Sequence, residues 1–156
     1  VFDSCYSLTS LDLTSWNTSK VTGLSYMFEY CIELVNLNLS GWDVTKVKVF
    51  NSLFSDCYKL ETLNLDGWDL SNAIGFSNTF LRCRSLTNVV GTIKGIKANI
   101  DLSNSPLTND SAMVFINGLA TVTQSRSIKF SADTYNTLTD EQINIATSKG
   151  WTITHA

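Results

Sequence analysis

Four cysteines are the residues whose chemistry the sequence raises first. Cys5, Cys31, Cys57 and Cys83 follow one another at a constant interval of 26 residues. Zinc sites need converging ligands at C-x-x-C-type spacing, and this interval supplies none. Equivalent positions in successive units would place the four side chains in one parallel column. The distance between neighbouring units permits disulfides, but parallel side chains point past one another. We expect buried free thiols, with two disulfides as the open alternative.

Other groups able to do catalysis or bind metal are scarce. The one histidine is His155, close to the C-terminus. Asp66 and Asp69 lie near Asn64, but no calcium loop of the D-x-[DN]-x-[DN]-G type surrounds them. The chain also lacks the G-x-S-x-G, Walker, H-E-x-x-H and Rossmann motifs. We therefore expect no enzymatic activity, no cofactor and no metal site.

Composition limits the classes of partner. The chain has 156 residues, with 11 basic and 14 acidic side chains and a net charge of −3. Scattered basic residues in an acidic chain do not favour nucleic acid as a partner. Hydrophobic residues make up 44% of the chain, which is enough for a core. No apolar run reaches the roughly 18 residues that would cross a membrane.

The cysteine interval belongs to a longer repeat. Trp16, Trp42 and Trp68 keep the same spacing, and a fixed period of this length predicts a solenoid. The aromatic and leucine columns are expected to form its core. The fourth copy departs from the pattern, because Gly91 and Lys94 replace the expected leucine and tryptophan. The other positions that repeat are Phe2, Phe28, Phe54 and Phe80, and Leu8, Leu34, Leu60 and Leu86.

Each unit predicts the same local structures. Its L-x-x-L-x-L segment predicts a short parallel strand, as at Leu11–Leu13, with leucines facing the core. The stretch before the strand, such as residues 27–31, predicts a helical turn or short helix. The residues after each tryptophan are predicted to cap the next backbone N–H groups. These capping residues are Asn17, Asp43 and Asp69.

The polar residues that alternate with the core leucines are the candidate binding residues. They would project from the concave sheet face that solenoids use for binding. Short polar side chains suit hydrogen bonding to a peptide or a sugar, although they could equally be solvated strand residues. The candidates are Ser10, Asp12, Asn36, Asn38, Thr62, Asn64 and Asn88, with Asp101 and Lys129 if the sheet continues.

The last third of the chain predicts longer elements. Strands are expected at 99–103, 127–131 and 151–154. Thr108 is a plausible N-cap for one helix, and a capping box from Thr139 to Gln142 begins another, which Lys149 and Gly150 end. We expect a single parallel sheet of roughly seven strands, lined by helical turns in the first half and helices in the second.

The repeat resembles the BspA-like leucine-rich repeats of bacterial surface proteins. The resemblance covers residues 1–91 and implies an α/β leucine-rich-repeat solenoid. Residues 92–156 would be atypical C-terminal repeats and a cap within the same single domain, 1–156. The resemblance also implies an extracellular or cell-surface location in a bacterium. It is carried by Met27, Phe28 and Cys31, by Leu34, Leu37 and Leu39, and by the S-G-W-D-V-T run at 40–45.

Two functions follow as expectations. The first is a non-enzymatic adhesion or binding module that holds a protein or glycan of a host or bacterial surface on its concave sheet. The second is a structural spacer that presents other domains. A start at Val1, in phase with the repeat, is typical of a segment of a longer array, which would suit a spacer.

Overall fold

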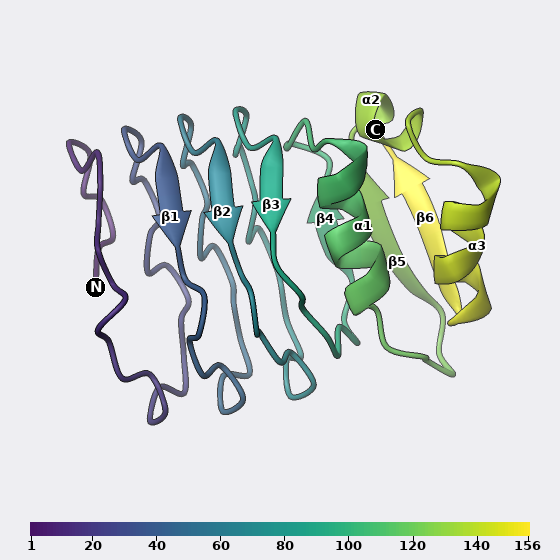
Figure 1. The fold of residues 1–156 in the computed structure, drawn as a ribbon, viewed down its shortest axis with the longest axis horizontal. Coiled ribbons are helices and arrows are strands. Elements are labelled where there is room, and N and C mark those ends of the chain that lie inside the picture. Colours follow the sequence, from purple (N-terminus) through teal and green to yellow (C-terminus); the bar gives the residue numbers. More distant parts are fainter.

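The protein is a mixed α/β structure with parallel strands in two sheets, and this confirms the predicted α/β class (Figure 1). The computed structural model describes all residues 1–156. The first sheet has the order β1-β2-β3 and the second the order β4-β5-β6. The strands of the first sheet are β1 (Asn36–Asn38), β2 (Thr62–Asn64) and β3 (Asn88–Val90).

The first sheet brings equivalent positions of successive units side by side. Leu37 pairs with Leu63, which pairs with Val89, and all three side chains are buried. Beyond the strands, the Leu39 N–H donates to the Asn64 carbonyl at 2.9 Å. The sequence interval of 26 residues is therefore also the interval between hydrogen-bonded neighbours. The strand predicted at Leu11–Leu13 does not form.

The helical turns predicted before the strands do not form. Residues 25–30 make consecutive turns instead of a helix, because Tyr26 and Tyr30 have a left-handed backbone conformation. This backbone hydrogen-bonds to the next unit: the Phe28 N–H donates to the Leu53 carbonyl at 3.0 Å, and the Phe54 N–H donates to the Thr79 carbonyl at 3.0 Å. The left-handed residues keep the repeat interval in two columns, Ser4, Tyr30, Asp56 and Arg82, and Tyr26, Ser52 and Asn78.

Aromatic side chains form the predicted core in the inner units. Phe28 stacks on Phe54 with 5.9 Å between ring centres, and Trp42 and Trp68 are buried. The prediction fails for Trp16, which is 41% exposed because it has a neighbouring unit on one side only. Core packing by these columns is the main apolar contribution to stability.

The four cysteines are free thiols, as predicted. Cys31, Cys57 and Cys83 are buried, and Cys5 is partly exposed. The Cys57 thiol points at the Phe28 carbonyl, with 3.1 Å between sulfur and oxygen, so each inner thiol has a partner in the preceding unit rather than another sulfur. Burial raises the pKa of Cys31 to about 11.

The C-terminal elements were largely predicted. Thr108 accepts a hydrogen bond from the Ser111 N–H, and Thr139 and Gln142 form a complete capping box. No helix is both long enough and apolar enough to cross a membrane. The elements are β4 (Ile100–Leu102), α1 (Asn109–Gly118), β5 (Arg126–Phe130), α2 (Ala132–Tyr135), α3 (Asp140–Ser148) and β6 (Trp151–His155).

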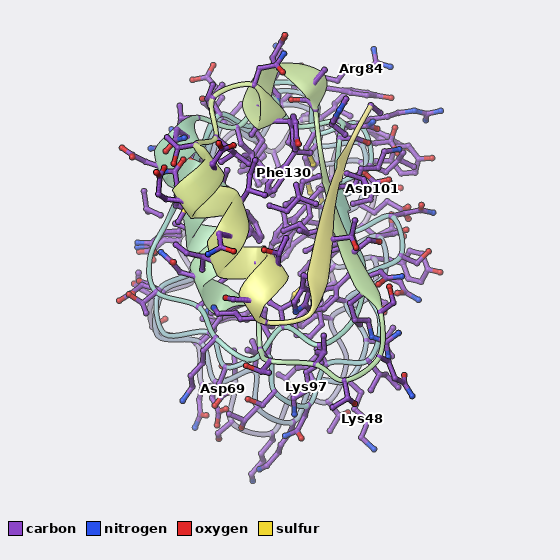
Figure 2. The ribbon with its side chains drawn as sticks, turned by 90° about the vertical axis from the view of Figure 1, so that its right-hand side faces the viewer. Lys48, Asp69, Arg84, Lys97, Asp101 and Phe130 are labelled. Atoms are coloured by element: carbon purple, nitrogen blue, oxygen red, sulfur yellow. The ribbon has the colours of Figure 1, made fainter.

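The second sheet does not continue the first. Figure 2 shows α1 and α3 on one side of the molecule and the strands β5 and β6 on the other. We call β1–β3, α1 and α3 the front layer, and residues 49–57, residues 75–83 and β4–β6 the back layer (Figures 1 and 2). The prediction of one sheet of about seven strands is therefore wrong.

Helix α1 replaces a fourth strand beside β3. The Ser111 hydroxyl accepts the Val89 N–H at 2.9 Å and donates to the Thr87 carbonyl at 3.0 Å. Thr108, the N-cap, also donates its N–H to Thr87 at 3.0 Å. These bonds satisfy part of the edge of β3 that would otherwise pair with another strand.

Candidate functional site

A hollow of about 530 Å³ lies over the first sheet. Six of the predicted binding residues line it, and Asn88 is the strand partner of Thr62 beside it. We call the following residues the polar sheet face: Ser10, Asp12, Asn36, Asn38, Thr62, Asn64 and Asn88. The structure thus brings together seven of the nine predicted residues on one surface of the front layer.

Two asparagines of this face also shape the backbone. The Asn38 Oδ1 accepts the N–H of Ser40 at 3.1 Å, and the Asn64 Oδ1 accepts the N–H of Asp66 at 3.0 Å. These side-chain-to-backbone bonds turn the chain where each strand ends. They use the amide oxygen, so the Nδ2 group of each side chain keeps both of its donors free.

The neighbouring polar column makes no side-chain hydrogen bonds within the protein. Asn36, Thr62 and Asn88 lie next to one another across the three strands. Asn36 and Asn88 are exposed, and Thr62 is half-buried. Neighbouring strands lie about 4.8 Å apart, so the free groups repeat at that spacing.

Asp12 is the one charged side chain that lines this hollow. The Thr14 N–H and hydroxyl donate to its carboxylate at 3.0 and 2.7 Å. These bonds hold the pKa of Asp12 below its usual value, so the group stays ionised at neutral pH. A lone ionised carboxylate has no second titratable group in the hollow to exchange a proton with.

Two predicted residues, Asp101 and Lys129, do not join this face. They line a second hollow of about 610 Å³ on the back layer. Their placement with the other seven is therefore wrong, because the sheet does not continue. The sequence held a signal: β4 begins at Ile100, only 12 residues after Asn88, where β3 begins. That is about half the repeat, so β4 falls on the opposite side of the unit.

Sequence reasoning missed the second hollow as a surface. Its lining comes from four separate segments: 74–78, 98–101, 126–129 and Thr154. No motif in the sequence links these segments, because the repeat interval has changed by this point. Arg126 is the charged side chain in it that was not among the predicted residues.

The capping residues after the tryptophans act as predicted. Asn17 accepts the Ser19 N–H at 3.1 Å, and Asp43 accepts the Thr45 N–H at 3.0 Å. Asp69 accepts the N–H of Ser71 and also pairs with Lys94 at 3.1 Å. No three His, Cys, Asp or Glu side chains gather where they could hold a metal ion.

These features define an α/β protein with an exposed polar sheet face, built from a 26-residue repeat. Residues 1–105 match the family described as "Mycoplasma protein of unknown function, DUF285", and the chain belongs to this family. The matched span includes β1 to β4. Neither the curated proteins nor the solved structures contain a match.

Proposed function

We propose that the chain is a leucine-rich-repeat solenoid of the BspA-like kind. Pairing of equivalent residues such as Leu37 and Leu63 supports a stack of units. The back of each unit supports it too, since the Phe28 and Phe54 N–H groups bond to the following unit. A solenoid provides a long surface on which equivalent side chains repeat at the strand spacing.

We infer that this solenoid is a non-enzymatic binding module, with the polar sheet face as its ligand surface. The free donors of Asn36, Asn38, Asn64 and Asn88 are the observation that carries this function. They stand on adjacent strands over one hollow or beside it, and no group of the protein accepts from them. The single charge, on Asp12, leaves recognition mainly to hydrogen bonds.

A protein or glycan in an extended form is the ligand class that fits this surface. Each neutral hydrogen bond contributes only about 1 kcal/mol net, so affinity requires several bonds along a polymer. An extended peptide or sugar chain crossing the strands would meet one amide after another. The resemblance to bacterial surface repeats favours adhesion to a host or bacterial surface as the biological role.

The experiment is a binding screen of the purified chain by interferometry. The analytes are extracellular-matrix proteins, mucins and neutral bacterial polysaccharides. The test variant is Asn38→Asp with Asn64→Asp, because aspartate keeps the oxygen that accepts the Ser40 and Asp66 N–H groups but removes the donors. The matched control is Asn117→Asp with Asn144→Asp, which adds the same charge on α1 and α3.

Saturable binding that the test variant loses and the control keeps would support the proposal. Equal binding by both variants would overturn the polar sheet face as the ligand surface. A folded wild-type chain that binds no analyte would contradict the binding function and favour the structural spacer.

A further inference from the structure

We propose that the second hollow, on the back layer, is a separate binding site for an anionic polysaccharide. No sequence pattern predicts a basic surface, because the basic residues are scattered along an acidic chain. The fold brings two of them, Arg126 and Lys129, into the lining of this hollow, and Lys48 and Lys97 next to lining residues. Such a surface would act independently of the polar sheet face, which lies in the front layer.

Two basic side chains line the hollow directly. Arg126 forms no ion pair, and its guanidinium donates only to the neutral Gln124 side chain, at 3.2 Å. Lys129 approaches one acid, with 3.9 Å between its Nζ and Asp101 Oδ2. Asp101 is the one acidic residue in the lining. The hollow therefore carries a net positive charge.

Two further lysines stand at its border. Lys97 directly precedes Ala98, which lines the hollow, and is exposed. The carbonyl of Lys48 accepts the N–H of Ile74, another lining residue, at 2.8 Å. Neither lysine forms an ion pair with an acidic side chain. Figure 2 shows Asp101 beside the back-layer strands, and Lys48 and Lys97 further down, below the lower ends of these strands.

The remaining lining favours a sugar polymer over nucleic acid. Ser127 and Thr154 project hydroxyl groups from strands β5 and β6. Phe76, the one aromatic residue in the lining, is buried and offers no ring on which a base could stack. Sulfate or carboxylate groups would meet the basic side chains while sugar hydroxyls meet the polar ones.

The net charge of −3 does not oppose this assignment. Local potential at a concave surface, rather than net charge, determines where a charged ligand binds. In the lining itself, Arg126 and Lys129 against Asp101 leave an excess of one positive charge, and Lys48 and Lys97 are next to lining residues. Counterions released from a polyanion make such binding strongly dependent on salt.

The test measures binding of the full chain to chondroitin sulfate and to polygalacturonate at low ionic strength. These two polymers carry sulfate with carboxylate and carboxylate alone, so they distinguish the source of the anionic group. Neutral dextran and a single-stranded oligonucleotide are the comparison ligands. The test variant is Arg126→Gln with Lys129→Gln. Its control, Lys20→Gln with Lys59→Gln, removes the same charge from elsewhere on the surface.

Wild type should bind at least one polyanion and not dextran, with the affinity falling about tenfold in the test variant and about twofold or less in the control. Asp101→Asn, which keeps an oxygen for the Ser103 N–H, should increase the affinity. Absence of polyanion binding, equal losses in both double variants, or tighter binding to the oligonucleotide would each overturn the proposal.

Discussion

At the residue scale, two asparagines of the polar sheet face have a structural role beside the binding role that we propose for them. The oxygen of Asn38 closes a turn with Ser40, and that of Asn64 closes the same turn with Asp66. Their amide nitrogens donate no hydrogen bond within the protein. The sequence predicts which residues alternate with the leucines. It does not predict that the side-chain oxygen is used in a turn while the nitrogen stays free, because this depends on the backbone geometry.

Because only the side-chain oxygen of Asn38 takes part in the turn, two substitutions of this residue should affect stability differently. Asn38→Ala removes the turn bond and should lower the free energy of unfolding by about 1 kcal/mol, as loss of a cap does. Asn38→Asp keeps the bond and should leave stability nearly unchanged. Urea unfolding of both variants measures the difference, and equal stabilities would show that the side-chain bond contributes nothing.

The cysteine column predicts both thiol protection and a pH dependence. At pH 8 a thiol reagent should modify the native chain at Cys5 only, since Cys31, Cys57 and Cys83 are buried. Mass spectrometry of the labelled peptides identifies the modified sites. Fast labelling of Cys57 in the native chain would contradict the buried column.

The sign of the pH dependence follows from burial, which raises the pKa of Cys31 to about 11 and also raises the pKa values of Cys57 and Cys83. An unfolded thiol ionises near pH 8.5, roughly, so the unfolded chain loses protons first as pH rises. Stability should therefore fall from about pH 8.5 towards pH 11. Urea unfolding across this range measures the fall, and Cys57→Ala should make it less steep.

At the element scale, the turns of the back layer are the feature that periodicity alone could not predict. Residues 25–30 have the spacing of a helical turn, but left-handed Tyr26 and Tyr30 interrupt the helix. Neither residue is a glycine, so no composition signal marks the conformation. Bonds to the next unit, such as that from the Phe28 N–H, hold this backbone in place.

At a position with a left-handed backbone, the stability of a variant should depend on how well the new residue tolerates that conformation. Tyr26 has φ of 62° and its side chain is 51% exposed, so little packing is lost on replacement. Asn tolerates this conformation and β-branched residues do not. Tyr26→Val should therefore be about 1 kcal/mol less stable than Tyr26→Asn. Thermal unfolding compares the two variants, and equal melting temperatures would contradict a left-handed backbone at this position.

At the scale of the whole molecule, the main departure from the repeat is that the interval between successive strands changes after β3. The sequence correctly predicts the strands of the last third, including β4 at Ile100–Leu102. It does not predict that these strands lie in the back layer, because this depends on α1 occupying the position beside β3. The Ser111 hydroxyl holds α1 in the place of a fourth strand by its hydrogen bonds to Val89 and Thr87. No sequence pattern identifies these bonds.

Because α1 replaces a fourth strand beside β3, the predicted binding residues lie on two surfaces with different chemistry. The polar sheet face has free amide donors and the single charge of Asp12. The back-layer hollow has Arg126 and Lys129 against Asp101. We propose that the first surface binds a protein or neutral glycan and that the second binds polyanions independently.

The most direct measurement is one interferometry comparison of wild type, Asn38→Arg with Asn64→Arg, and Arg126→Gln with Lys129→Gln. Each is tested against the protein or neutral glycan selected in the screen and against chondroitin sulfate. We predict that the arginine variant loses the first ligand and keeps the polyanion, while the glutamine variant does the reverse. If one variant loses both ligands while remaining folded, or if neither variant loses its own ligand, the account of two separate surfaces is contradicted.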